Sequence, residues 1–300
     1  MNINFEYYRV FYYVAKYRNF TKAAHALGSS QPNVTRAMNC LESATQCTLF
    51  IRTNRGVRLT PEGERLYTRV AAAISLLQMA EDEMTESAKL EHGSIVIGAS
   101  ETALGIYLLD KLKRFHMEYP GIRIKLYNHS TPQAVQSVKS GEVDFAVVTT
   151  PTKVSDPLKE VELETFREVL VGGKTFKGLA TKRIGLEKIQ TYPFICLGKE
   201  TMTYQFYNQI FGTKGVELKP DTEVATTDQI LALVKHELGL GFLPEPMAKR
   251  EIEEHRIIQI PLKDKIPERK VCMIYDVKRP MGVAAQKLKK ILMEDKQEDR

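Results

Sequence analysis

The sequence predicts a multi-domain α+β chain: a small helical domain that ends in a β-hairpin, one long helix, and two α/β lobes. Three observations support this prediction. With 300 residues, the chain is longer than one hydrophobic core usually organises. Apolar residues recur at helical spacing through residues 1–60, whereas strands alternate with helices from residue 94 onward. The composition, 43% hydrophobic and 27% charged, is typical of a soluble globular protein and argues against wholesale disorder.

Several protein classes are disfavoured by composition. The longest nearly apolar stretch, residues 70–80, is far shorter than the roughly 20 residues that cross a bilayer. The N-terminus lacks the basic start and apolar core of a secretory signal, so we expect a cytoplasmic protein without a membrane partner. No CxxC pair occurs among the four cysteines, which predicts reduced thiols and no structural zinc site. We expect no cofactor and no bound metal.

The net charge of +6 is concentrated in residues 1–60. That segment carries eight basic and two acidic side chains, so it accounts for the whole excess. A positive segment on a neutral body indicates that a polyanion binds one end of the molecule. A solvated basic face is the alternative that charge alone leaves open.

The first two helices are predicted from apolar spacing. An apolar stripe at helical intervals is formed by Phe5, Tyr8, Phe11, Tyr12 and Ala15. Asn19 is suited to cap a second helix, in which Ala23, Ala24 and Leu27 face inward. Two adjacent alanines let a neighbouring helix approach closely, as a tight helix-turn-helix requires.

A third helix follows the Gly28-Ser29 break, with Ser30 as its N-cap and Pro32 in its first turn. Its buried face is predicted to consist of Val34, Met38 and Leu41. Its outer face carries Gln31, Asn33, Thr35, Arg36 and Asn39. Gln and Asn pair with adenine, and Arg with guanine, in the major groove, where the second helix of a helix-turn-helix meets base edges. The alternative is a solvated polar helix face.

A β-hairpin is predicted in the segment LFIRTNRGVRLT, where three arginines surround Gly56. These arginines are Arg52, Arg55 and Arg58. Such a hairpin forms a wing beside the helix-turn-helix, and its guanidinium groups are suited to phosphate contacts.

The runs FTKAAHAL (20–27), SQPNVTR (30–36), LFIR (49–52) and RGVRLTPEG (55–63) resemble the N-terminal domain of LysR-type transcriptional regulators. The resemblance implies a winged helix-turn-helix at residues 20–39 that binds double-stranded DNA. The DNA-contacting residues that it implies are Ser30, Gln31, Pro32, Asn33, Thr35, Arg36, Arg52 and Arg55. Two positions depart from the family pattern. Gln46 replaces the usual glycine after the third helix, and Asn33 replaces a residue that is often small and apolar.

A long helix is predicted to begin at Thr60-Pro61-Glu62, with a hydroxyl cap and acids near its positive end. Apolar residues spaced by four and three predict a coiled-coil seam of Leu66, Val70, Ala73, Leu77, Ala80 and Met84. This seam favours a homodimer, which supplies the two reading units that a palindromic operator needs. Packing on the chain's own domain is the alternative. In the resembled family, dimers commonly pair into tetramers, and RNA polymerase is a further partner that the resemblance allows.

The C-terminal two-thirds is predicted to form two β-α-β series. The first comprises strands 94–99, 122–127 and 143–149 and helices 104–115 and 131–140. The second comprises strands near 166–171, 194–197, 222–225 and 241–243 and helices near 203–212 and 227–237. A strand at 269–277 and a helix at 283–293 complete the chain.

These two series resemble the effector domain of LysR-type regulators, which is similar to a periplasmic solute-binding protein. We expect the chain to cross between the lobes near 161–165 and 264–269. The expected domains are a DNA-binding domain (1–60), a linker helix (61–90) and an effector domain (91–300). Within the last, lobe I is expected at about 91–162 and 268–300, and lobe II at about 163–267.

Such lobes bind ligands beyond the carboxyl ends of the strands, where helix N-termini point inward. The candidates for binding a small-molecule effector are Ser100, Glu101, Thr102, Thr149, Thr150, Thr201, Thr203 and Thr226. The hydroxyl groups suit a small carboxylate or another oxyanion. Glu101 instead favours an amine or an effector of mixed charge. Each threonine taken alone is also explained as a helix cap.

Three other functions fit the sequence less well. An enzyme is disfavoured because the sequence has no GxSxG, Walker A, GxGxxG or HExxH motif. A free-standing solute-binding protein leaves the basic helix-turn-helix unexplained. An effector-independent, architectural DNA-binding protein explains the charge but leaves the two lobes without a role. The sequence therefore favours a sequence-specific regulator, with the architectural protein as the alternative.

Overall fold

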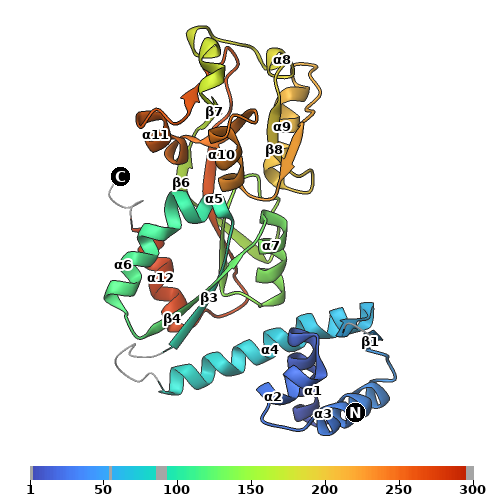
Figure 1. Ribbon diagram of the computed structural model, residues 1–300. Helices are drawn as coiled ribbons and strands as arrows, with labels where there is room; N and C mark the ends of the chain where they lie inside the picture. Colours follow the sequence, from blue (N-terminus) through green and yellow to red (C-terminus); the bar gives the residue numbers. More distant parts are fainter. Residues whose placement is uncertain (1–2, 54–55, 86–92, 295–300) are drawn as a thin grey trace. The chain divides into compact units, whose positions relative to one another are not determined.

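The computed structural model describes residues 3–53, 56–85 and 93–294 of the chain, without the side chains of residues 52–53 and 78–85. The chain divides into two compact units (Figure 1). The first contains the N-terminal helices and the long helix, and the second contains the two α/β lobes. No helix among the described residues is long and apolar enough to cross a membrane.

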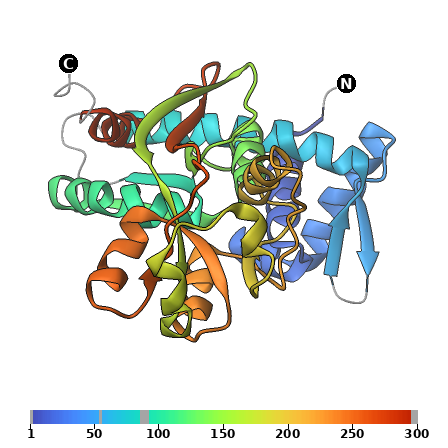
Figure 2. The same ribbon diagram turned by 90° about the horizontal axis from the view of Figure 1, so that it is seen from above.

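The N-terminal unit consists of α1 (Phe5–Tyr17), α2 (Phe20–Ala26), α3 (Gln31–Thr45), β1 (Phe50–Thr53), β2 (Gly56–Leu59) and α4 (Pro61–Thr85). Both predicted helix caps are confirmed. The Asn19 side chain accepts a hydrogen bond from the Lys22 amide (2.9 Å), and Ser30 Oγ accepts one from the Asn33 amide (3.4 Å). The predicted hairpin is also confirmed, since β1 and β2 pair antiparallel (Figure 2).

The core of this unit gathers side chains from all its helices and from the hairpin. Its members include Phe11, Ala23, Met38 and Leu41, all fully shielded from solvent. The predicted stripe on α1 is wrong at Phe5, which lies in the first turn beside the ring of Tyr8 and is 55% exposed. Val10 and Val14 are buried on α1 instead, so the buried face is rotated relative to the prediction.

At the end of α3, Gln46 stands where the resembled family usually has glycine. This residue adopts φ 52°, a left-handed conformation that glycine tolerates better than glutamine. After the hairpin, Thr60 Oγ1 accepts a hydrogen bond from the Gly63 amide (3.0 Å) and so caps α4. A Cβ atom at Gly63 would lie 2.2 Å from the Leu49 carbonyl oxygen, so only glycine allows the helix to start this close to the hairpin.

The predicted seam on α4 falls on two different faces of the helix. Val70 is buried in the core of the N-terminal unit, and so is Ile74, which was not part of the predicted seam. Leu66 is partly buried against that core. Val70 is therefore unavailable for a coiled-coil seam. Ala73 and Leu77 are exposed, and the predicted side chains of Ala80 and Met84 lie outside the described residues.

Lobe I is built on a five-stranded sheet with the order β4-β3-β5-β12-β6. Its strands are β3 (Gly93–Ala99), β4 (Ile122–Asn128), β5 (Phe145–Thr149), β6 (Leu158–Phe166) and β12 (Arg269–Asp276). Its helices are α5 (Glu101–Ala103), η1 (Leu104–Leu108), α6 (Leu109–Glu118), α7 (Thr131–Ser140) and α12 (Val283–Met293). The helices α6 and α12 pack on one face of the sheet and α7 on the other.

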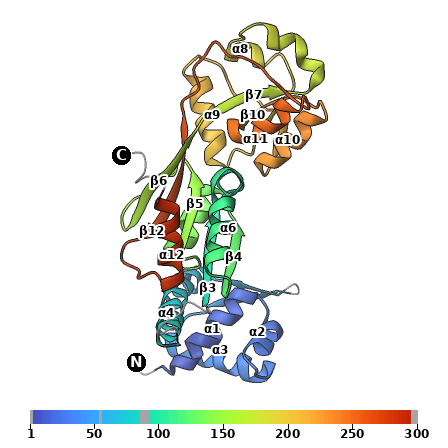
Figure 3. The same cartoon turned by 90° about the vertical axis from the view of Figure 1, so that its left-hand side faces the viewer.

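Lobe II is built on a second five-stranded sheet with the order β11-β7-β10-β8-β9. Its strands are β7 (Glu168–Gly172), β8 (Phe194–Leu197), β9 (Thr222–Val224), β10 (Leu240–Pro244) and β11 (Ile258–Gln259). Its helices are η2 (Lys174–Thr181), α8 (Leu186–Ile189), α9 (Met202–Gly212), α10 (Thr227–Lys235) and α11 (Glu245–Glu253). The helix α9 covers one face of the sheet, and α10 and α11 cover the other (Figure 3).

The two lobes are linked by two neighbouring chain segments. The antiparallel strands β6 and β12 belong to the sheet of lobe I, and the chain passes between the lobes at Arg167 and just before Arg269 (Figure 3). The expected first crossing at 161–165 is therefore wrong. The apolar residues of segment 158–166 do not alternate with a spacing of two, so their pattern does not mark one continuous strand of lobe I.

Candidate DNA-binding surface and interlobe site

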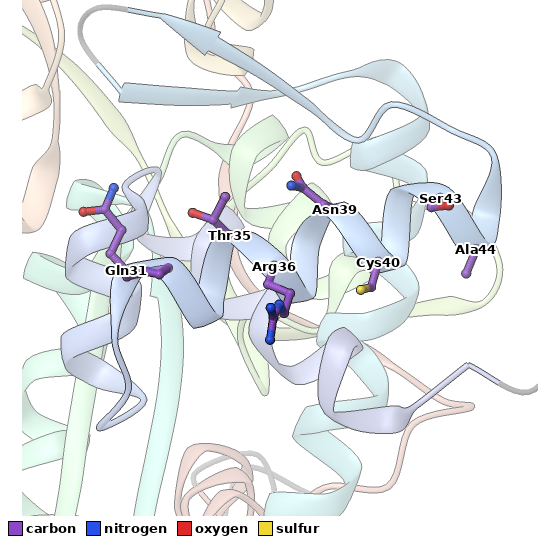
Figure 4. A pocket seen from close by; sticks show the side chains of 8 residues that line it. Gln31, Thr35, Arg36, Asn39, Cys40, Ser43 and Ala44 are labelled. Atoms are coloured by element: carbon purple, nitrogen blue, oxygen red, sulfur yellow. The ribbon is translucent and has the colours of Figure 1, made fainter.

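The outer face of α3 forms a shallow, solvent-open surface along the whole helix. This surface is lined by Gln31, Pro32, Thr35, Arg36, Asn39, Cys40, Ser43 and Ala44 (Figure 4). Four of the predicted DNA-contacting residues therefore line this surface: Gln31, Pro32, Thr35 and Arg36. Ser30 lies at the N-cap, and Asn33 is exposed on an adjacent part of the first turn. We call this the α3 surface.

Two features fix the chemistry at the start of the α3 surface. The Thr21 hydroxyl on α2 donates a hydrogen bond to Gln31 Oε1 (3.2 Å), which orients the amide of Gln31. Arg36 is exposed, and it forms no ion pair within the described part of the chain. By contrast, the Arg9 guanidinium is paired with the Glu6 carboxylate at 2.7 Å. Arg36 is thus a cation that is available to an anionic or guanine-bearing partner.

The hairpin is anchored to α3 by a carboxylate that sequence reasoning did not single out. Glu42 Oε1 accepts hydrogen bonds from the backbone amides of Leu49 (2.6 Å) and Phe50 (3.2 Å). The Val57 amide of β2 donates to the Arg18 carbonyl oxygen (3.1 Å), which ties the second strand to the end of α1. The wing therefore has a fixed base next to the helix-turn-helix.

The side chain of Arg52 and the whole of Arg55 lie outside the described residues. The third predicted arginine, Arg58, is exposed on β2.

Between the lobes, two predicted effector residues meet a buried guanidinium. Arg269 Nη2 donates to Thr149 Oγ1 (2.8 Å) and to Thr203 Oγ1 (2.9 Å). Its Nη1 donates to Glu168 Oε1 at 2.6 Å, and both side chains of this ion pair are almost fully buried. Arg269 thus joins Thr149 to Thr203, and Glu168 neutralises its charge; neither Arg269 nor Glu168 was predicted as a site residue from the sequence.

A second interlobe contact involves Thr102. Its hydroxyl shares a hydrogen bond of 2.8 Å with the hydroxyl of Thr227 at the start of α10, and both residues are buried. The structure therefore places Thr102 beside the start of α10, next to the predicted effector residue Thr226. Thr226 itself precedes the helix, and its amide donates to Gln229 Oε1 (3.3 Å).

The remaining predicted hydroxyls accept hydrogen bonds from backbone amides of the protein. Ser100 Oγ accepts from the Ala103 amide and Thr201 Oγ1 from the Tyr204 amide, so both act as helix caps. Thr150 Oγ1 accepts from the Lys270 amide (2.9 Å). An effector would therefore have to bind hydroxyls that already accept hydrogen bonds from the protein.

The carboxylates of the interlobe site have shifted acidities. Burial and the nearby Asp228 carboxylate raise the pKa of Glu101, whose Oε2 accepts a hydrogen bond from Asn128 (3.3 Å). Burial also raises the pKa of Glu168, although the Arg269 guanidinium opposes this shift. The pKa of Tyr207, buried next to Glu168, is raised well above its usual value by burial and by that carboxylate.

The sequence does carry one signal for the Glu168–Arg269 ion pair, which was not predicted: each residue is a charged residue at the first position of an otherwise mostly buried strand. Glu168 begins β7 and Arg269 begins β12, next to the two crossings between the lobes. No group of three or more metal-ligating side chains is found within the residues that the structure describes.

Two family descriptions match the chain. Residues 5–64 match "Bacterial regulatory helix-turn-helix protein, lysR family", and residues 88–297 match "LysR substrate binding domain". Together they cover most of both units.

Individual proteins give the same result. The chain is 30% identical over 237 residues to "HTH-type transcriptional regulator YofA" of Bacillus velezensis, which is 79% of each chain. Its fold is similar to that of a full-length OxyR variant from Pseudomonas aeruginosa, with a TM-score of 0.74, 17% identity, and 98% of this chain and 94% of that one covered. It is also similar to full-length CbnR in complex with its target DNA, with a TM-score of 0.68, 18% identity, and coverage of 97% and 99%.

Proposed function

The chain belongs to the LysR-type family of DNA-binding transcriptional regulators with an effector-binding domain, and we propose that its α3 surface reads the operator. In this proposal Gln31, Asn33 and Arg36 contact base edges in the major groove. Ser30, Pro32 and Thr35 pack at the start of the helix against the DNA, and Arg52 and Arg55 of the wing contact phosphates. The observation that carries this proposal is the solvent-open outer face of a capped helix, on which Gln31, Asn33 and Arg36 are exposed.

We further propose that the active species is a homodimer joined through α4. Exposed apolar side chains on this helix support the proposal, because Leu76 and Leu77 are 42% and 48% exposed and face away from the unit's own core. A two-fold dimer places two α3 surfaces on the two halves of a palindromic site. Assembly into tetramers, contact with RNA polymerase and action in the cytoplasm belong to the same proposal.

The effector in this proposal is a small polar molecule bound between the lobes, next to Thr102, Thr149, Thr203 and Thr226. The threonine hydroxyls favour an effector that carries oxygen acceptors, and Glu101 favours one that also carries a cationic group. Such a molecule changes DNA binding only by its different affinities for two lobe arrangements.

The experiment that tests this function is a footprint of the purified protein on DNA upstream of its own gene and of the neighbouring genes. Excess nonspecific competitor DNA is present throughout. We expect protected patches related by two-fold symmetry that survive competitor at moderate salt. Protection that spreads evenly over every fragment and collapses with salt would leave only electrostatic binding and would favour an architectural protein.

A further inference from the structure

The strongest link between the lobes is the side chain of Arg269, which stands at the point where the chain re-enters lobe I. It is only 2% exposed, which is unusual for an arginine. Four of its N–H donors are engaged: Nε with the Thr150 carbonyl (2.8 Å), Nη1 with Glu168, and Nη2 with Thr149 and Thr203. A guanidinium has five such donors in a rigid plane, so this side chain is close to saturated by the protein itself.

The partners of Arg269 come equally from the two lobes. Lobe I supplies the hydroxyl of Thr149, the carbonyl of Thr150 and the ring of Phe166, whose centroid lies 5.5 Å from the guanidinium carbon. Lobe II also supplies three groups, with a carboxylate in place of the backbone carbonyl. These are the hydroxyl of Thr203, the carboxylate of Glu168 and the ring of Phe206 at 5.1 Å. The planar cation therefore binds both lobes at once.

Among the described residues, two further side-chain hydrogen bonds join the lobes. One joins the hydroxyls of Thr102 and Thr227, and another joins Lys153 Nζ to Gln205 Oε1 (2.9 Å) in an exposed position. Neither fixes an angle, because a single hydrogen bond allows rotation about its own axis. Arg269 makes directed contacts to several points on each lobe, so it constrains rotation as well as separation.

Stability alone is a weak explanation for this arrangement. A buried ion pair costs desolvation, and well-packed apolar residues of similar volume often serve as well or better. The network is also incomplete. Glu168 Oε2 is buried and has no hydrogen-bond partner of normal geometry among the described residues, although Tyr207 lies beside this carboxylate. A group retained at such a cost is better explained by the geometry that it imposes.

We propose that Arg269 is a positioning residue that acts as a built-in ligand: it binds threonine hydroxyls of both lobes and holds the two lobes at one interlobe angle. An effector then has to shift an arrangement that the protein has already set, rather than close two loosely hinged lobes. The proposal concerns contacts within the chain and is tested without added ligand, so its failure is distinguishable from failure of the proposed function; only the consequence for an effector rests on that function.

The test is a pulsed spin-label distance measurement on the full-length chain without added ligand. Labels are attached through Lys287→Cys on α12 and Asn208→Cys on α9, both exposed helix positions, in a Cys40→Ser, Cys47→Ser background. The buried Cys196 and Cys272 remain. Dilution with excess unlabelled chain restricts the signal to distances within one subunit. For the parent protein we expect a single narrow distribution.

Three variants separate bridging from charge and from folding. Thr203→Val removes one interlobe bond with little change of shape, and Thr131→Val is its control, because the Thr131 hydroxyl bonds the Thr149 carbonyl within lobe I. Arg269→Lys keeps the charge opposite Glu168 but loses the planar fork. The double variant Arg269→Met, Glu168→Leu removes the whole link without leaving a buried charge unpaired.

We expect distributions at least about twice as wide for Thr203→Val, Arg269→Lys and the double variant, because each lets a second lobe arrangement become populated. Thr131→Val should keep the parent width. Thermal unfolding checks that each variant is folded, and if the double variant does not fold, the Thr203→Val comparison decides. Parent-like widths for Thr203→Val and Arg269→Lys would overturn the proposal and leave Arg269 with a purely stabilising role.

Discussion

The α3 surface and the interlobe site are built in opposite ways. The α3 surface lies within residues 31–44, so one helix places all its side chains. The interlobe site combines residues from 102 to 269, and its central contact joins Glu168 to Arg269 across two strands of different sheets. A surface on one helix tolerates substitution of its exposed side chains, whereas a site assembled from several elements depends on buried polar groups that are costly to leave unpaired.

The largest effect that this comparison predicts is at Glu168. Replacing it in Glu168→Leu leaves the Arg269 guanidinium buried without its carboxylate, which should destabilise the second unit by about 3–5 kcal/mol. The measurement is thermal or denaturant unfolding, followed with a probe specific to that unit. The matched control is Glu268→Leu, whose carboxylate pairs with Arg167 where both side chains are at least half exposed and should matter little. Equal destabilisation by the two variants would contradict this account.

The next effect concerns the base of the wing. Glu42→Ala removes the carboxylate that accepts the amides of Leu49 and Phe50, and charge-assisted hydrogen bonds of this kind contribute about 1.5–3 kcal/mol. We expect a loss of that size in the unfolding free energy of the N-terminal unit. Glu6→Ala is the comparison, because the exposed Glu6 carboxylate has its ion pair only with Arg9 among described residues. No difference between these two variants would mean that the wing does not depend on Glu42.

A smaller change, of opposite sign, is expected at the end of α3. Gln46→Gly relieves the left-handed backbone at φ 52° and should stabilise the N-terminal unit by up to about 1 kcal/mol. Ser43→Gly, an exposed position in the last turn of the same helix, should instead destabilise it by about 0.5 kcal/mol. The two midpoints of thermal unfolding should therefore move in opposite directions, and movement in the same direction would show that Gln46 is not strained.

The smallest effect is a pH dependence at the interlobe site. Since the folded-state pKa of Glu101 is raised by burial and by Asp228, its contribution to stability is present at low pH and is lost as pH rises through that pKa. Glu101→Gln should remove this part of the pH dependence and raise stability at neutral pH. Asp228→Asn should weaken the dependence by removing the second cause. If stability varied with pH in the same way in the parent protein and in Glu101→Gln, Glu101 would not be the source of this pH dependence.

Local features of the fold could be read from the sequence because neighbouring residues determine them. The caps Asn19 and Ser30 and the paired alanines of α2 follow from short-range hydrogen bonding and spacing, and the structure confirms them. The predicted α/β lobes and the LysR-type family are likewise confirmed, and with them the prediction of a regulator rather than an enzyme.

Features that depend on distant residues were missed. The heptad spacing on α4 does not show which face of the helix packs on the chain's own core. In the structure, Val70 and Ile74 are buried in that core. Nothing near Arg269 in the sequence indicates that Glu168 and Thr203 lie beside it, since these partners are 101 and 66 residues away. Buried charges paired over such separations are visible only once both sheets are placed.

The most direct test of the central claim, that the α3 surface reads base sequence, is selection of bound sites from a random DNA pool by the parent protein and by Arg36→Ala. If Arg36 contacts a base, the variant should lose its preference at one position of each half-site and about 1–3 kcal/mol of affinity for the selected operator. Preferences at the other positions should be retained. An unchanged consensus with uniformly weaker, less salt-dependent binding would make Arg36 a phosphate contact and would contradict the claim.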